Sequence, residues 1–184
     1  EMISLFDLAK CSKNGAHFDI KRLLWFNHHY LQECDEQMLV DTLKAQIAEH
    51  GADAKSDEYV KTVVQMMKER INLPQELWEQ CNFFFAAPTE FDEKSLKKWW
   101  KPEAPKYVSE LCDFLEAQND WTGETLEPKV MEWIASKEYK TGAVMNAFRV
   151  TLVGAARGPQ IFAITDMLGR EESLRRARKA VETL

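Results

Sequence analysis

The stretch from Lys140 to Gly169 constrains the fold more than any other part of the sequence, because it predicts two helices separated by a glycine turn. We expect Thr141 to cap the first helix and Gly154 to end it with a positive φ. Apolar residues recur there at helical spacing and predict one buried face, made of Val144, Met145, Phe148 and Leu152.

The second helix of this stretch begins at Gly158-Pro159, where proline in the first turn loses no hydrogen bond. Gly169 is expected to end it. Its predicted buried stripe consists of Ile161, Ile164 and Leu168. Arg149 lies about 100° around the first helix from Phe148, beside the apolar face. Two interpretations stay open: a solvated arginine on a core helix, or a guanidinium that binds an anion or a polar base edge near the start of the second helix.

Helical spacing also dominates the remaining sequence, and no strand pattern, repeat or low-complexity tract interrupts it. The chain is therefore predicted to be all-α. Ala87-Pro88-Thr89 is the expected boundary between two consecutive helical-bundle modules, 1–86 and 87–184. The further predicted helices cover Ile3–Lys10, Asp19–Leu31, Asp35–Glu49, Ser56–Arg70, Leu77–Phe85, Asp92–Trp100, Val108–Leu115, Leu126–Ile134 and Leu174–Val181.

Composition indicates a soluble globular protein, with 45% hydrophobic and 29% charged residues. No apolar run approaches the ~20 residues that cross a bilayer, so we expect no membrane partner. The chain starts at Glu1, which suggests a piece of a longer protein. Four scattered cysteines without a CxxC pair favour reduced thiols in a cytoplasmic protein: Cys11, Cys34, Cys81 and Cys112.

Charge is unevenly distributed along the chain. The net charge is −6, yet residues 140–184 carry eight Lys and Arg against four Asp and Glu. An acidic body with a basic end fits a protein that contacts RNA on one face. An exposed C-terminal helix rich in arginine would give the same asymmetry.

Motifs of catalysis are missing from the sequence, which contains no GxxxxGK[ST], GxGxxG or GxSxG. We therefore predict no catalytic residue in this segment. The nearest metal-like cluster is His28, His29, Glu33 and Cys34. It lacks HExxH and a fourth ligand at suitable spacing, so we expect no metal site.

Two aromatic runs have to be assigned to the core or to RNA stacking. Phe83-Phe84-Phe85 favours the core, because a helical bundle needs large apolar anchors. For Trp99-Trp100 the core and RNA stacking are equally supported, since Lys97, Lys98 and Lys101 lie beside them in the sequence and could bind a phosphate.

Two separate runs resemble bacterial glutamyl-tRNA synthetases. One comprises residues 148–154 (FRVTLVG), 158–162 (GPQIF) and 168–176 (LGREESLRR), which resemble the end of the family's anticodon-binding part. The other, residues 12–27 (SKNGAHFDIKRLLWFN), resembles the segment after the catalytic body, with the form G-A-x-F-D-x-x-K-L-x-W-x-N. Arg22 stands where the family has lysine. The family's two ATP-site signatures, HIGH-like and KMSKS-like, are absent.

The resemblance implies that the chain grips an anticodon stem and loop, with the bases unstacked. The residues that carry this role by resemblance are Arg70, Arg149 and the turn of Gly158, Pro159, Gln160 and Ile161. Some members have a polar residue in place of Gly158. We expect Arg70 to recognise the third anticodon base, Arg149 a neighbouring base or phosphate, and Pro159 and Ile161 to face a base. Further candidates for RNA binding are Lys97, Lys98, Trp99 and Arg157.

The parent protein implied by the resemblance is a class I glutamate–tRNA ligase that uses ATP and Mg²⁺. Its expected partners are tRNA(Glu) and the catalytic body of the same chain, in a cytoplasmic monomer. No cofactor is expected in this segment. The alternative is a helical protein-interaction module that does not bind RNA and docks through Trp99-Trp100.

Overall fold

The computed structural model describes residues 6–7, 15, 17–53 and 55–184. These residues form ten α-helices and three 3₁₀-helices, and none of them lies in a strand, so the all-α prediction is confirmed. The α-helices are α2 (Ile20–Glu33), α3 (Glu36–Glu49), α4 (Asp57–Met67), α5 (Leu77–Cys81), α6 (Glu93–Trp99), α7 (Ala104–Glu116), α8 (Gly123–Ser136), α9 (Thr141–Val153), α10 (Ile161–Leu168) and α11 (Arg170–Thr183). The 3₁₀-helices are η2 (Lys68–Arg70), η3 (Pro74–Glu76) and η4 (Asn82–Phe84).

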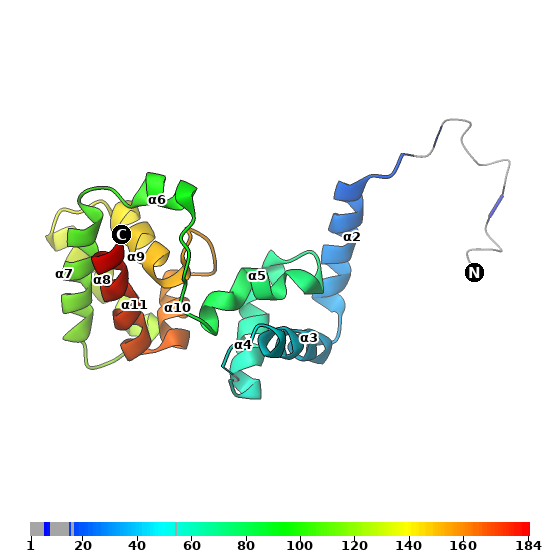
Figure 1. Cartoon of the computed structure of the whole chain (residues 1–184), viewed down its shortest axis with the longest axis horizontal. Helices are drawn as coiled ribbons and strands as arrows, with labels where there is room; N and C mark the ends of the chain where they lie inside the picture. The colour runs from blue at the N-terminus through cyan, green and yellow to red at the C-terminus, as the bar shows by residue number, and fades with distance from the viewer. Residues whose placement is uncertain (1–5, 8–14, 16, 54) are drawn as a thin grey trace.

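The helices gather into two groups along the long axis of the molecule (Figure 1). One group holds α2 to α5, and the other holds α6 to α11. The predicted boundary between residues 86 and 87 falls in the segment that connects α5 and η4 to α6. We call these groups the first and second modules; their independence as folding units stays a prediction.

Local capping explains where several helices of the first module begin. The Asp19 carboxylate accepts a hydrogen bond from the backbone N–H of Arg22, and the Ser56 hydroxyl accepts one from Tyr59. Each bond satisfies a donor that the first helical turn leaves free. Helices α3 and α4 then pack on each other and on α5 through an apolar face. Its fully buried members are Leu39, Leu43, Val63, Val64 and Met67.

The second module is built around α9, which packs against α6, α7, α8 and α11. Its predicted stripe is largely buried: Val144, Phe148 and Leu152 are inaccessible or nearly so, whereas Met145 is partly exposed. Gly154 ends the helix with φ 82°, as predicted.

Phe83, Phe84 and Phe85 join the two modules. All three are buried, which confirms their assignment to the core. They belong to one hydrophobic cluster that contains residues of both modules. Arg176 of α11 adds a polar connection, since its Nη1 donates to the carbonyl oxygens of Phe83, at 2.6 Å, and of Leu152, at 3.0 Å.

Two predicted helix starts are wrong. Thr141 is the first residue of α9 and its side chain makes no capping hydrogen bond; Lys140 occupies the cap position. Pro159 precedes α10, which begins at Ile161 after Gln160. Arg149 Nη1 donates to the Pro159 carbonyl, and that bond holds the proline in the preceding loop. The predicted helix Ile3–Lys10 lies outside the described residues, apart from Phe6 and Asp7, which are not helical.

Replacing Gly154 by alanine is expected to destabilise the second module. A Cβ there would lie 2.7 Å from the Glu90 carbonyl oxygen, in a conformation that L-residues rarely adopt. We expect a loss of about 1–3 kcal/mol, which thermal unfolding would record as a Tm lower by about 3–10 °C. Gly51→Ala is the matched control, because its φ is also positive but its Cβ would meet nothing within 4 Å. Equal losses in both variants would contradict the contact with Glu90.

Across the described ranges, no helix has the length and apolar character needed to cross a membrane. Cys34, Cys81 and Cys112 are free thiols. Burial raises the pKa of the Cys81 and Cys112 thiols to about 12, so both are protonated and unreactive at neutral pH.

Candidate nucleic-acid interface

Arg70 lies at the end of η2, one short turn beyond α4, rather than in the last turn of α4 as expected. Its side chain is exposed. Within the described part of the chain, the structure gives its guanidinium no hydrogen-bond or ion-pair partner. All five N–H donors of the planar group therefore face solvent or a ligand.

A groove of about 460 Å³ runs beside Arg70 along α2. Its lining includes the Lys21 ammonium, the Trp25 indole and the Glu69 carboxylate. Trp25 is 62% exposed, and its ring is oriented by a parallel contact with His29, with centroids 6.2 Å apart. Two cations, one anion and an exposed indole make this groove suitable for nucleic acid. Sequence inspection missed Lys21 and Trp25, although their i, i+4 spacing on a helix was visible.

Arg149 is half-buried on α9 and holds the loop before α10. Its Nη1 donates to the carbonyl oxygens of Arg157, at 3.2 Å, and Pro159, at 2.5 Å. Within the described residues these two bonds use only Nη1, so Nε and Nη2 keep their donor capacity. The interpretation as a solvated arginine is therefore wrong, because Arg149 is half-buried and bound to the loop. Its binding to an anion or a base edge stays a prediction.

Arg70 and Arg149 belong to different modules but lie near each other. Burial lowers the pKa of Arg149, and the positive charge of Arg70 lowers it further. Two like charges are costly to hold together without an anion between or beside them. Arg70 and Arg149 therefore both contribute positive charge near the junction of the modules.

The turn from Gly158 to Ile161 lies against Arg149 and the first module. Gly158 has φ 102°, and a Cβ there would lie 3.3 Å from the Phe83 ring and 3.8 Å from Arg149 Nη1. Pro159 is buried and Ile161 is 4% exposed, so most of both side chains contributes to the core. The exposed residue of the turn is Gln160, whose amide donates to the Glu127 carboxylate at 2.6 Å.

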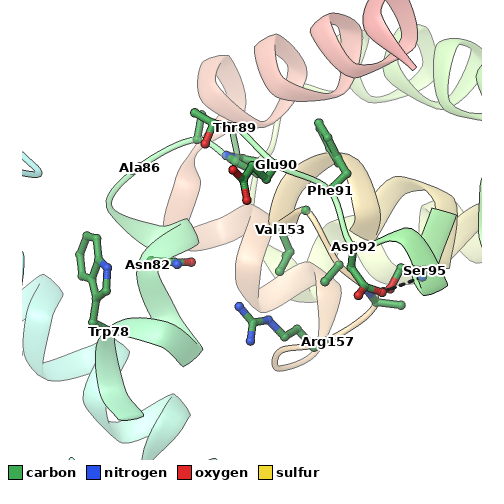
Figure 2. Close-up of a pocket in the computed structure, with 15 residues that line it drawn as sticks. Trp78, Asn82, Ala86, Thr89, Glu90, Phe91, Asp92, Ser95, Val153 and Arg157 are labelled. Carbon is green, nitrogen blue, oxygen red and sulfur yellow. Dashed lines mark hydrogen bonds between the residues drawn. The ribbon is translucent and has the colours of Figure 1, made fainter. Parts of the chain in front are cut away.

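A hollow of about 720 Å³ lies between residues of the two modules (Figure 2). Trp78 and Asn82 line it from the first module, and Glu90, Asp92 and Arg157 line it from the second. Hydrogen bonds from the Ser95 hydroxyl and backbone N–H lower the pKa of Asp92, so the carboxylate is ionised at neutral pH. With two carboxylates and one guanidinium, the hollow disfavours a phosphate, in contrast to the groove beside Arg70.

Arg157 is directed toward the first module across this hollow (Figure 2). Its Nη2 donates to the Glu79 carbonyl at 2.8 Å, while its buried Nε has no partner within the described structure. One part of the guanidinium is therefore committed to the contact between modules, and its role in RNA binding stays a prediction.

The other RNA-binding candidates lie on α6. Lys97 pairs with Glu93 at 3.2 Å, and Lys98 Nζ lies 4.7 Å from the centre of the Trp99 ring. Trp100, by contrast, packs against the hydrophobic core. The two tryptophans therefore differ. Trp100 is structural, whereas RNA binding by Trp99 and Lys98 stays a prediction.

The four residues of the metal-like cluster have separate contacts. His28 Nδ1 lies 2.8 Å from the Ile71 carbonyl, and His29 lies 3.8 Å from Glu33 on the exposed side of α2. The Cys34 thiol donates to the Leu31 carbonyl. Over the described residues, no group of three His, Cys, Asp or Glu side chains is placed to hold a metal ion.

Known proteins similar to this chain are glutamate–tRNA ligases. The chain is 49% identical to a glutamate–tRNA ligase of Bacteroides fragilis and 48% identical to that of Phocaeicola vulgatus, in each case over all 184 residues. It spans 36% of the length of either relative.

Solved structures agree with these relatives. A glutamate tRNA ligase from Elizabethkingia meningosepticum, determined in complex with its amino acid, superposes with a TM-score of 0.82 at 35% identity. The alignment covers 97% of this chain and 35% of that one. A glutamate–tRNA synthetase from Elizabethkingia anophelis gives 0.78 at 33% identity, over 96% and 34% of the two chains.

The family assignment follows from a model that matches most of the chain. The model is described as an anticodon binding domain, and it matches residues 30–181. This range includes Arg70, Arg149 and the Gly158–Ile161 turn, and it extends across both modules. The chain therefore belongs to the anticodon-binding domain family, as the matched glutamate–tRNA ligases also indicate.

Proposed function

We propose that this chain is the anticodon-binding part of a glutamate–tRNA ligase and binds the anticodon stem-loop of tRNA(Glu) at the junction of its two modules. The observation that carries the proposal is the anticodon-binding-domain match over residues 30–181, which includes the exposed Arg70 of η2 and the half-buried Arg149 of α9. Each guanidinium keeps donors free for a base edge or a phosphate.

The proposed division of roles follows from hydrogen-bonding chemistry. The glutamate anticodon ends in cytosine, whose pairing edge offers two acceptors and one donor. The glutamine anticodon ends in guanine, which offers two donors and one acceptor. A guanidinium only donates, so Arg70 matches cytosine and leaves guanine donors unsatisfied. Arg149 contacts a neighbouring base or phosphate, next to the turn formed by Gly158, Pro159 and Ile161.

The catalytic part of the proposed parent lies outside these 184 residues. It would bind ATP and Mg²⁺ and attach glutamate to the tRNA, in a monomeric cytoplasmic enzyme. The chain's match to about a third of the relatives' length supports this division of labour, and its free cysteine thiols suit the cytoplasm. Lys97, Lys98, Trp99 and Arg157 are the secondary candidates for contacts with the RNA backbone.

Salt dependence of RNA binding tests the proposal directly. We expect a fluorescently labelled tRNA(Glu) anticodon stem-loop to bind the chain, with log K falling linearly as log salt rises. The expected slope is about −0.7 to −0.9 per phosphate contact, because each contact releases counterions. Fluorescence anisotropy at several ionic strengths measures it. Binding that is absent, or insensitive to salt, would instead favour a protein-interaction module that does not bind RNA.

A further inference from the structure

We propose that Asn27, His28 and Gln32 of α2 are positioning residues for Arg70 and thereby set the specificity for the third anticodon base. This proposal rests on the proposed function, in which Arg70 binds that base. Each acts on the backbone of the segment that carries Arg70. Of the three, His28 also lines the groove beside Arg70, whereas Asn27 and Gln32 do not.

Three side chains of α2 donate hydrogen bonds to backbone carbonyls around Arg70. Asn27 Nδ2 donates to the Asn72 carbonyl at 2.5 Å, and Gln32 Nε2 donates to the Lys68 carbonyl at 3.1 Å. His28 Nδ1 lies 2.8 Å from the Ile71 carbonyl. Because a carbonyl oxygen only accepts, His28 must carry its proton on Nδ1.

These bonds bracket Arg70 in sequence and reach the segment from one side. The Lys68 carbonyl precedes Arg70 by two residues, and the other two carbonyls follow it directly. Lys68 Nζ returns a bond to the Gln32 carbonyl at 2.8 Å. Ile71 is fully buried, whereas Arg70 is exposed. The backbone is therefore fixed on both sides of Arg70, and its guanidinium projects from a fixed base.

Apolar packing contributes little to holding helix α2 in place. Leu31 is its only buried residue, and Ile20, Leu23, Trp25 and Tyr30 are at least half exposed. Helix α2 packs against η2. Polar bonds to η2 and to the two residues that follow it therefore carry much of the attachment between α2 and the bundle, and the same bonds fix the direction of Arg70.

Specific hydrogen bonding to a base edge requires that the donors be held within about 0.5 Å of the productive geometry. A 3₁₀ turn of three residues has few hydrogen bonds of its own to supply that precision. The Asn27, His28 and Gln32 side chains supply it from outside. Loss of one bond is expected to weaken the preference for cytosine over guanine rather than to abolish binding.

The test compares Asn27→Leu, which keeps the size of the side chain but removes its donor, with the unmodified chain. The measured quantity is the Kd for the stem-loop whose anticodon ends in guanine, divided by the Kd for the stem-loop whose anticodon ends in cytosine. We expect this ratio to fall about 2- to 10-fold, as for the loss of one hydrogen bond. In an Arg70→Ala background, Asn27→Leu should leave the ratio unchanged, because the group it positions is gone.

Three further variants separate positioning from general stability. His28→Asn keeps a donor near Nδ1 and should retain most of the discrimination, whereas His28→Leu should lose it. Gln46→Leu is the matched control. Its amide binds the Pro74 and Gln75 carbonyls at 3.4 and 3.3 Å and accepts from Trp78 N–H, so it holds a neighbouring loop that does not carry Arg70. It should lower Tm without changing the ratio.

The possible results are distinguishable. If Arg70→Ala does not change the ratio, the proposed role of Arg70 itself fails. If Arg70→Ala reduces the ratio but neither Asn27→Leu nor His28→Leu does, only the positioning role is overturned. Equal effects of Asn27→Leu with and without Arg70 would also overturn it, since they would show that Asn27 acts independently of the arginine.

Discussion

The Arg70→Ala variant is expected to bind the glutamate anticodon stem-loop more weakly and to lose most of its preference over the glutamine stem-loop. A well-placed bidentate contact to a base discriminates by about 1–3 kcal/mol, which corresponds to roughly 5- to 150-fold. Removing the guanidinium removes both the favourable contact with cytosine and the unsatisfied donors that disfavour guanine. Anisotropy titrations of both stem-loops, at one fixed salt concentration, measure the two Kd values.

Arg178→Ala serves as the matched control for that experiment. Arg178 lies on α11 and is held by the Glu116 carboxylate at 2.6 Å, with 45% of its side chain exposed. Its removal changes the net charge by the same amount as Arg70→Ala. The control should therefore reproduce any general electrostatic loss of affinity and keep the ratio of the two Kd values. A ratio that survives Arg70→Ala would remove Arg70 from base recognition.

The loss in Arg70→Ala is expected without a comparable loss of stability. The side chain is exposed, and the structure shows no intramolecular partner for it within the described residues. Surface substitutions of this kind usually change the free energy of unfolding by less than about 0.5 kcal/mol. A Tm within about 2 °C of the unmodified chain would show that the effect belongs to binding.

Local features of the sequence were sufficient to predict the helical architecture. Asp19, Ser56 and Asp92, at which three predicted helices begin, each accept a capping hydrogen bond. The Gly154 prediction also holds, because positive φ at a helix end is a local preference of glycine. Such signals depend on neighbours within about four residues, which the sequence displays directly.

Predictions failed where distant residues decide the backbone conformation. Pro159 stays outside α10 because Arg149, ten residues earlier, binds its carbonyl. The contacts around Arg70 are likewise distant: Asn27 and Asn72 are separated by 45 positions, and Gln32 and Lys68 by 36. The acceptors are backbone carbonyls, which every residue has, so the sequence does not show which of them are bound. Only a structure reveals that these polar residues of α2 face η2.

Arg70 and Arg149 were proposed as RNA-binding residues because of the family resemblance. Their residue type and position in the sequence alone would not have identified them. An exposed arginine at a helix end has a sufficient structural explanation in the helix dipole, and Arg149 has one in its loop contacts. What distinguishes both residues is their proximity across the two modules, a property of tertiary structure. Phe83 and Arg176 connect the two modules that carry these arginines, so the stability of this junction bears on the proposed binding.

Replacing Arg176 by methionine is expected to cause a large loss of stability. Its side chain is 4% exposed and makes bonds to the Phe83 and Leu152 carbonyls and, through Nε, to the Glu172 carboxylate at 2.6 Å. Methionine preserves apolar volume but leaves two buried carbonyls unsatisfied. We expect a loss of about 3 kcal/mol, or a Tm lower by about 6–12 °C for a chain of this size.

Arg178→Met controls for the loss of an arginine from the same helix. It breaks a half-exposed pair with Glu116, and exposed pairs contribute less than about 1 kcal/mol. Glu172 is not left unpaired in Arg176→Met, because Arg175 binds both of its carboxylate oxygens at 2.7 Å. The expected difference between the two variants therefore comes from the unsatisfied carbonyls at the junction rather than from charge.

Measuring RNA affinity of the Arg176→Met variant tests whether the loss of stability also affects the proposed function. Arg176 fixes the Phe83 backbone, and the Phe83 ring lies against Gly158, next to Arg149. Loosening Phe83 in Arg176→Met should therefore separate Arg70 from Arg149. If both bind RNA as proposed, affinity for both stem-loops should fall even below the Tm of the variant. Arg176→Met with unchanged Tm would contradict the buried connection. A lower Tm with unchanged RNA affinity would show that Arg70 and Arg149 keep their relative position without it.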